Sequence, residues 1–294
     1  MAQGSWLIVG TVPDAHFPLY YGSYHLEDER IYFDDADLQP ISVQRGTAAL
    51  LAAAWLTLQA LGKATPKALV CGDLGQGEGS AKVYDLLVQR LPEETFSGLT
   101  FHYLYPDVDW HNRIFMGLES LARRPLLVCD AGFMYVAKMS GYAQSYDLFT
   151  PDLGELTFLA DAKAPHPFYT RGFVQAEDHD VAELAARAFE QGNAAAWLLV
   201  KGHEDCLVHQ GKVLETIAEP NLPVLEAIGG TGDLLTGVVT GLLAAGWPMQ
   251  RACLWGARLC RKAGELASPT PASQITDILP KIPALLTELA VAKA

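Results

Sequence analysis

The sequence predicts an α/β protein built on a doubly wound, mostly parallel sheet, and two observations carry that prediction. Short apolar stretches alternate with longer amphipathic stretches of helical period along most of the 294 residues. Some of the short stretches are apolar throughout, as in PLLVCD at 125–130, which is typical of parallel strands covered on both faces. Parallel neighbours need a crossover connection, so the alternation indicates βαβ units with helices on both sides of one sheet.

The first 45 residues are aromatic and acidic and predict a β-rich edge or lid, with strands near 6–9 and 31–33. We expect this segment to belong to a single domain that spans residues 1–294, a length that can bury one large core.

The middle of the chain alternates regularly. An Ala- and Leu-rich helix at 46–61 ends at Gly62, and KALVC at 67–71 is an apolar strand rich in β-branched residues. The next helix, 80–91, carries Val83, Leu86, Leu87 and Leu91 on one face. The same patterns predict strands at 99–104, 125–130 and 146–150, and helices at 110–122 and from about 153.

The last third begins after a loop at 162–173 that contains prolines and histidines. An amphipathic helix at 178–192 leads into an apolar strand at 195–202. An antiparallel hairpin at 206–217 follows, with Gly211 and Lys212 at its turn. Three helices complete the chain, at 233–245, 248–267 and about 272–291.

Composition excludes several kinds of partner. Asp and Glu total 34 against 21 Lys and Arg, which gives a formal charge of −13 and disfavours nucleic acid and anionic membranes. A phosphate ligand would therefore depend on local amides, a few cations and a metal ion. No apolar run reaches about 18 residues, and the run at 6–9 lacks the charged flank of a signal peptide, so we expect a cytoplasmic protein without a membrane partner. The five cysteines form no C-x-x-C pair and are expected to be buried thiols.

Glycine and acidic residues recur directly after five predicted strands, in VCGDLGQG, YLYPDVD, VCDAG, FTPDLGE and LVKGHED. The carboxyl ends of parallel strands meet at one edge of a sheet, where such sheets bind ligands. The candidates for the substrate side of this crevice are Gly72, Asp73, Gly75, Asp130, Asp152 and Glu155. Plainer interpretations stay open: a surface turn at 72–80, an Asp130 that accepts backbone amides, and carboxylates that complement a helix dipole at 152–155.

The stretch GGTGDLLTGVVTGLLAAG at 229–246 places a glycine loop directly before an apolar helix. Amides at a helix start have no partner within the helix, so those of Gly229, Gly230, Thr231 and Gly232 can surround a phosphate or an oxyanion. Asp233 would lie beside this anion hole and could accept a proton from an attacking hydroxyl. The alternative is a glycine loop with Asp233 as a helix cap worth roughly 1 kcal/mol. Glycines and threonines at spacing four along the helix permit close approach of another backbone.

Taken with LLVKGHEDCLV, VCDAG and FTPDLGEL, this motif resembles the C-terminal core of the ribokinase-like superfamily. The closest resemblance is to the YjeF-type ADP- or ATP-dependent NAD(P)H-hydrate dehydratases. It implies a ribokinase-like three-layer fold and an enzyme that phosphorylates a hydroxyl on a damaged nicotinamide ring and then eliminates phosphate. It also implies ATP or ADP and Mg²⁺ as cofactors. Asp233 would be the base, Thr231 and Gly232 the anion hole, and Lys201 and Gly202 nucleotide contacts, while Glu155 would hold the metal through water.

The sequence also departs from that family. Asp152 and Leu153 stand where the family has histidine and proline, Gly132 and Tyr135 where it has aspartate and asparagine, and the N-terminal lysine and glycine motif is absent. These differences fall on substrate recognition, so a sugar, vitamin or nucleoside kinase and a non-catalytic nucleotide-binding regulator stay open, as does a homo-oligomer. A metal site at His102, Asp107, Asp109 and His111 is disfavoured because their spacing matches no standard ligand set. His166, between prolines, is expected to be structural or part of a lid.

Overall fold

The computed structural model describes residues 4–163 and 180–291 and divides into two compact units. The first unit comprises Met1–Leu19 and Leu69–Thr216, and the second comprises Tyr20–Ala68 and Ile217–Ala294. The prediction of a single domain stays a prediction.

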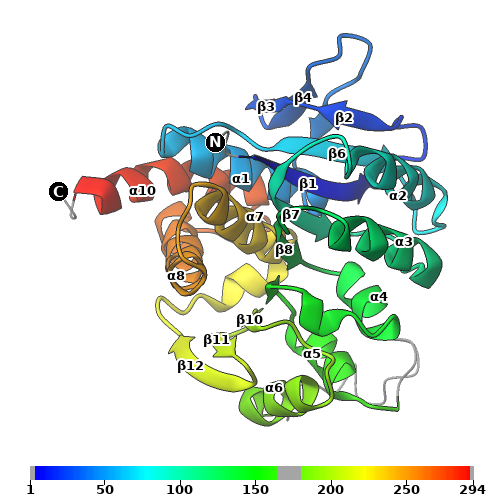
Figure 1. Ribbon diagram of the computed structural model, residues 1–294. Coiled ribbons are helices and arrows are strands. Elements are labelled where there is room, and N and C mark those ends of the chain that lie inside the picture. Colours follow the sequence, from blue (N-terminus) through cyan, green and yellow to red (C-terminus); the bar gives the residue numbers. More distant parts are fainter. Residues whose placement is uncertain (1–3, 164–179, 292–294) are drawn as a thin grey trace. The chain divides into compact units, whose positions relative to one another are not determined.

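The first unit contains a large sheet (Figure 1) whose strands follow the order β12-β11-β10-β9-β8-β7-β1-β6. Their bounds are Ser5–Val12 (β1), Lys67–Gly72 (β6), Phe96–His102 (β7), Leu126–Cys129 (β8), Leu148–Phe149 (β9), Trp197–Val200 (β10), Asp205–His209 (β11) and Lys212–Ile217 (β12). The pairs β1/β7, β7/β8, β8/β9 and β9/β10 are parallel, and β10/β11 is antiparallel. The α/β class with a mostly parallel sheet and a C-terminal hairpin is therefore confirmed.

Helices flank this sheet, as the alternation predicts. They are α2 (Glu78–Arg90), α3 (Val108–Glu119), α4 (Phe133–Met139), α5 (Leu153–Ala160), α6 (Val181–Glu190) and a 3₁₀ turn, η1 (Ala143–Ser145). Helix α2 packs against α3, α3 against α4, and α5 against α6. The apolar strands are buried on both faces: Leu7, Ile8 and Val9 of β1 have no exposed surface. Strand β1 is an inner strand, between β7 and β6.

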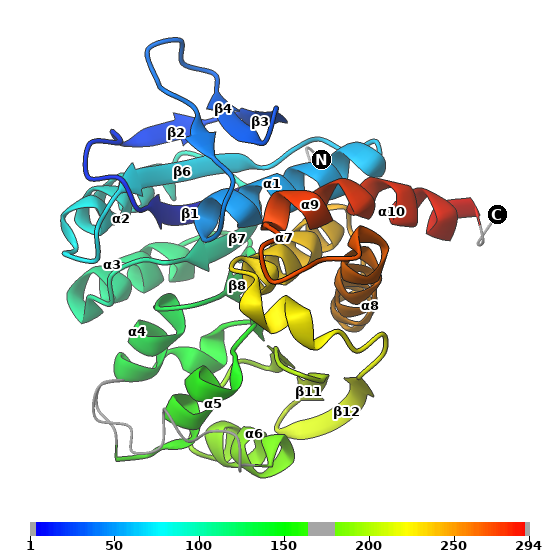
Figure 2. The same cartoon turned by 180° about the vertical axis from the view of Figure 1, so that it is seen from behind.

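The second unit combines a small sheet with a group of helices (Figure 2). Its strands are β2 (Tyr20–Gly22), β3 (Tyr24–Glu27), β4 (Arg30–Phe33) and β5 (Ile41–Ser42), of which β3, β4 and β5 form an antiparallel sheet. Its helices are α1 (Thr47–Ala60), η4 (Pro223–Ala227), α7 (Thr231–Ala244), α8 (Met249–Ala267), α9 (Ile275–Ile278), η5 (Leu279–Lys281) and α10 (Ile282–Val291). Helix α7 packs against both α1 and α8.

The glycine spacing of α7 permits the close approach that the sequence predicts, and α1 is the partner. A Cβ atom at Gly237 would lie 2.5 Å from the Leu50 carbonyl oxygen and 2.6 Å from the Ala53 Cβ. Only a glycine leaves room for α1 at this crossing, so α7 is held with little freedom to shift. The start of α7 is thereby fixed relative to the start of α1.

The structure differs from the sequence prediction in a few elements. The helix predicted at 272–291 is divided into α9, η5 and α10, because Pro280 has no amide to continue the hydrogen-bond ladder. The seven-residue helix α4 was not predicted, and neither were the short strands β2, β3 and β5. Most of the loop predicted at 162–173, with His166, lies outside the described residues.

Two expectations from composition can be compared with the structure. Cys71, Cys129, Cys206 and Cys253 are buried thiols, as predicted, and Cys260 is half-buried. Among the described residues, no helix is both long and apolar enough to cross a membrane.

Candidate active site

In the first unit, the carboxyl ends of the parallel strands lie at one edge of the sheet. The pairings of β7, β8, β9 and β10 place four of the five predicted polar strand ends there. The fifth end follows β6, where the Asp73 amide donates a 2.9 Å hydrogen bond to the carbonyl of Val12 at the end of β1. The expected convergence of polar groups at this edge therefore holds within the first unit.

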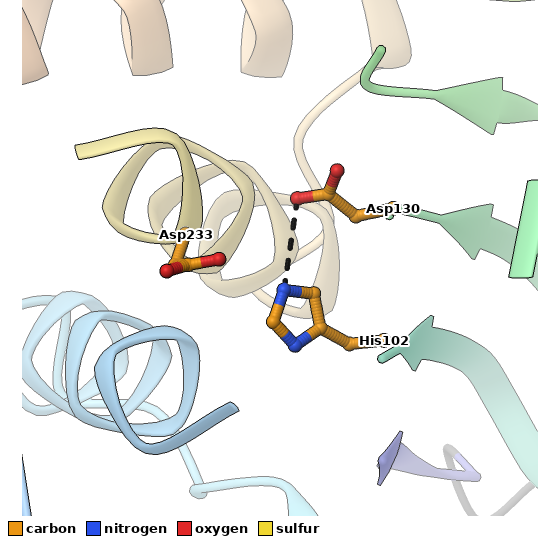
Figure 3. Close-up of side chains that lie close together, drawn as sticks. All are labelled: His102, Asp130 and Asp233. Atoms are coloured by element: carbon orange, nitrogen blue, oxygen red, sulfur yellow. Dashed lines mark ion pairs between the residues drawn. The ribbon is translucent and has the colours of Figure 1, made fainter. Parts of the chain in front are cut away.

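Asp130 is the centre of a buried charge cluster at this edge. Its side chain is 1% exposed, and one carboxylate oxygen, Oδ1, accepts the Lys201 Nζ at 2.6 Å and the Ala131 amide at 2.7 Å. The other oxygen, Oδ2, lies 3.9 Å from Nε2 of His102, and Figure 3 shows these two side chains pointing toward each other. Asp130 therefore satisfies a backbone amide, as the plainer interpretation expects, and also pairs with the predicted Lys201. His102 entered the sequence prediction only within a disfavoured metal set.

Asp152 and Glu155 form a capping box at the start of α5. The Glu155 amide donates to Asp152 Oδ1 at 2.7 Å, and the Asp152 amide donates to Glu155 Oε2 at 2.9 Å. This is the helix-start role that the sequence left open. The segment lies beside the end of β10, because the Lys201 amide donates to the Pro151 carbonyl at 2.8 Å. Gly202 donates its amide to Asp205 Oδ1 at 3.4 Å.

Glu155 is a buried acid whose proton affinity is raised. Burial is the largest cause, the Lys201 ammonium opposes it, and the nearby Asp152 and Asp130 add to it, so that the pKa of Glu155 is raised to about 8. The hydroxyl of Tyr135 donates to Glu155 Oε1 at 3.5 Å, and burial followed by the Glu155 charge raises the pKa of Tyr135 as well. Carboxylate oxygens of Asp152 and Glu155 are the kind of ligand that Mg²⁺ takes, and a cation there would replace the Glu155 proton.

Asp73 organises the glycine loop after β6. Its carboxylate accepts the amides of Gly75, Gln76, Gly77 and Ser80 at 2.9–3.1 Å, and also the Ser80 hydroxyl. Burial would raise the pKa of Asp73, but these hydrogen bonds outweigh burial and lower it. Gly72 is the last residue of β6, and Gly75 lies in this loop. That any of the three contacts substrate stays a prediction.

In the second unit, the GGTGD stretch forms the start of α7. Gly230 is the N-cap, with a φ of 95° that favours glycine, and no side chain caps it. A Cβ at Gly230 would also lie 3.1 Å from the Gln44 carbonyl oxygen. The Leu234 amide makes the first helical bond, to Gly230 at 2.8 Å, so the amides of Thr231 and Gly232 point out of the helix end. Gly229 is exposed, and Gly230, Thr231 and Gly232 are half-buried.

Asp233 does not cap its own helix, so that interpretation is wrong. Its side chain is buried, and Oδ2 accepts the amide of Gly46 at 2.6 Å. Gly46 is the N-cap of α1, so the carboxylate lies where the amides of that helix carry partial positive charge. Sequence reasoning missed Gly46, because nothing local connects it with a residue 187 positions away. The nucleotide face predicted from Lys201, Gly202 and 229–233 draws on both units and stays a prediction.

The disfavoured metal set has structural roles. Asp107 caps α3 by accepting the Trp110 amide at 3.0 Å, and Asp109 pairs on the surface with Arg113. His111 is fully buried, with Nε2 2.9 Å from the Tyr146 hydroxyl and Nδ1 2.8 Å from the Ser140 hydroxyl. Both ring nitrogens are therefore used within the core.

Because His111 is buried, we expect the folded protein to lose stability in acid. Burial lowers its pKa from 6.5 to about 3, so between these pH values the unfolded chain binds a proton that the folded protein refuses. The free energy of unfolding should fall as the pH drops through this window, at up to about 1.4 kcal/mol per pH unit from this group. Urea unfolding from pH 7 to pH 4 should show a flatter dependence for His111→Gln than for the wild type. The exposed His16→Gln variant is the control, and equal slopes for His111→Gln and the wild type would contradict the prediction.

The parallel sheet, its polar carboxyl edge and a glycine-started helix with a buried aspartate define a ribokinase-like α/β enzyme. A model of the carbohydrate-kinase family described as NAD(P)H-hydrate dehydratase matches residues 111–283, more than half of the chain. The chain belongs to this family, and it is an enzyme of the nucleotide-dependent dehydratase or carbohydrate-kinase type.

Individual proteins are similar to this chain in sequence or in fold. An uncharacterized protein of Methanocaldococcus jannaschii, MJ1337, is 34% identical over 238 residues, covering 81% of this chain and 98% of that protein. The pyridoxal kinase of Lactobacillus plantarum has a similar fold, with a TM-score of 0.55 at 16% identity, covering 97% of this chain and 98% of that one. The ADP/ATP-dependent NAD(P)H-hydrate dehydratase of Bacillus subtilis, co-crystallized with ATP and Mg²⁺, gives a TM-score of 0.52 at 16% identity, covering 95% and 88%.

Proposed function

We propose that this enzyme repairs hydrated NADH or NADPH, using ATP or ADP as phosphoryl donor. One observation carries the proposal: a buried carboxylate, Asp233, follows directly after two outward-pointing amides at the start of α7. The Asp233 carboxylate, which can accept a proton, and the amides of Thr231 and Gly232, which can bind an anion, thus lie within one helical turn. Phosphoryl transfer to a hydroxyl uses both kinds of group. Family membership supports the choice of substrate.

Asp233 would act as the general base. Its carboxylate takes the proton of the ring hydroxyl while the hydroxyl oxygen bonds to the terminal phosphorus of the nucleotide and the bond from phosphorus to the leaving phosphate oxygen breaks. The phosphate ester then leaves as inorganic phosphate, and a proton is lost from the adjacent ring carbon, which restores the dihydronicotinamide. The Gly46 amide holds the carboxylate in one orientation for the first step.

The amides of Thr231 and Gly232 would bind the transferred phosphoryl group, with Gly229 and Gly230 completing the loop. Lys201 and Gly202 would contact the nucleotide, as the family resemblance implies. Asp152 and Glu155 would hold Mg²⁺ through water, and the ion would neutralise phosphate charge. Because the Glu155 carboxyl, with a pKa of about 8, must lose its proton to solvent when a cation binds, we expect Mg²⁺ to bind more weakly as the pH falls below 8.

The test is a repair assay with a separate kinase assay. The protein is incubated with Mg²⁺, hydrated NADH and either ATP or ADP, and recovery of nicotinamide absorbance is followed. We expect recovery that depends on the nucleotide and releases one phosphate per NADH formed. The absence of recovery with both nucleotides would reject the repair function. Nucleotide consumption on a panel of sugars, vitamins and nucleosides would then indicate a plain kinase.

A further inference from the structure

Two neighbouring loops of the first unit expose large apolar side chains at the carboxyl edge of the sheet. Leu74, in the glycine loop after β6, is 62% exposed. Tyr103 and Tyr105, in the loop after β7, are 50% and 46% exposed. We call these three residues the aromatic rim. Large apolar groups left in water at a ligand-binding edge are typical of a recognition surface.

The backbone of the loop after β7 is held by buried side chains. The Tyr105 amide donates to the Ser80 hydroxyl at 2.9 Å, and the carbonyls of Tyr103 and Tyr105 accept the hydroxyls of Thr11 and Tyr84. Tyr103 has a φ of 50°, a conformation that a bulky side chain adopts only under constraint. These hydrogen bonds hold the backbone of the loop in a strained conformation. In that conformation the rings of Tyr103 and Tyr105 lie outside the core.

The glycine loop, which carries Leu74, also contacts the ring of Tyr105 through Gly77. Gly77 has a φ of 89°, and a Cβ placed there would lie 3.0 Å from Cδ1 of Tyr105, so the ring packs directly against glycine backbone. The carboxylate of Asp73 holds this loop through four amides. Both loops are therefore organised before any ligand binds, which reduces the entropy cost of binding.

The rim adjoins the buried charge cluster of the same unit. Tyr103 follows His102 directly, and the two rings pack edge to face with centroids 4.4 Å apart. His102 in turn lies 3.9 Å from Asp130. All three rim residues precede residue 111, where the match to the family model begins, so family membership assigns them no role.

We propose that the aromatic rim binds the carboxamide-bearing ring of the substrate, with a face of that ring packed against Tyr103 and Tyr105. If the proposed function holds, on which this inference rests, that ring is the hydrated dihydronicotinamide, whose planar part is the conjugated segment that carries the carboxamide. Tyrosine faces pack favourably on planar conjugated groups. The rim is then a specificity determinant that stands in place of the substrate residues from which this chain departs.

The experiment measures binding apart from turnover. Reduced nicotinamide mononucleotide is titrated into the wild type and into Tyr103→Ala, Tyr105→Ala and Leu74→Ser, and nicotinamide fluorescence is followed. ATP is titrated separately by calorimetry. We expect each tyrosine-to-alanine variant to bind the mononucleotide about tenfold more weakly, with ATP affinity unchanged. Tyr105→Phe, which keeps the ring, should stay within about twofold of the wild type, and the Leu74→Ser variant should lose a smaller factor.

Met116→Ala is the matched control, because Met116 is 69% exposed on α3 outside the rim. Unchanged mononucleotide affinity in all rim variants, or no binding to the wild type, would overturn the proposal. Weaker ATP binding instead would assign the rim to the adenine ring and would overturn it equally. If the wild type shows repair turnover but the rim variants bind the mononucleotide as well as the wild type does, the proposal for the rim is rejected and the proposed function stands. If the rim variants bind the mononucleotide more weakly but the wild type shows no repair turnover, the proposed function is rejected and the rim remains a binding surface. Thermal melting of each variant confirms that it is folded.

Discussion

Replacing Asp233 with asparagine is expected to lower turnover by about 10²- to 10⁴-fold while thermal stability stays close to that of the wild type. Asparagine has nearly the same shape, and its side-chain oxygen can still accept the 2.6 Å hydrogen bond from Gly46. What the variant loses is the negative charge and the capacity to take a proton. Turnover in the repair assay and melting with and without ATP are the measurements.

Two further variants separate catalysis from packing at this position. Asp233→Ala should lose both turnover and stability, because the Gly46 amide then loses a buried acceptor. Asp277 also lies in the first turn of a helix of the second unit and accepts the Gln274 amide at 2.9 Å, so Asp277→Asn should keep full turnover. Wild-type turnover in Asp233→Asn would reject the base assignment.

Removing the positive charge of Lys201 is expected to produce the largest loss of stability. Its ammonium lies 2.6 Å from Asp130 Oδ1, and the Asp130 side chain is only 1% exposed. Lys201→Met would leave a buried carboxylate without this partner, which typically costs about 3–5 kcal/mol. Urea unfolding at pH 7 measures the loss. The pKa of Glu155 should also rise above about 8, because the Lys201 charge holds it down.

A double variant identifies the cause of that loss. Lys201→Met combined with Asp130→Asn removes both charges and should recover part of the lost stability. The surface pair of Asp109 and Arg113, with side chains 77% and 55% exposed, is the control, and Asp109→Asn should cost less than about 1 kcal/mol. A Lys201→Met variant no less stable than Asp109→Asn would show that the buried pair contributes little.

Most of the fold could be predicted because its signals are local. Leu127, Val128 and Cys129 of β8 are apolar because they are buried within the sheet, and that pattern is visible without knowing the neighbours. The elements that escaped prediction are short: α4 has seven residues and β5 has two, too few to show a period. Pro280 was visible in the sequence, and the break that it makes in the last helical segment should have been expected.

The candidate site divides in the same way. The sequence by itself indicated that Asp152 and Glu155 stand at a helix start and that glycines precede α7, whereas the capping box of Asp152 and Glu155 came from the structure. The pairing of Asp233 with Gly46 spans 187 positions, and that of Lys201 with Asp130 spans 71. Only the tertiary structure decided these pairings, because they depend on how helices pack and on the order of the strands. Caps and turns depend on residues that are neighbours in the sequence, so they can be predicted locally. The partners of buried charges depend on how the whole chain packs.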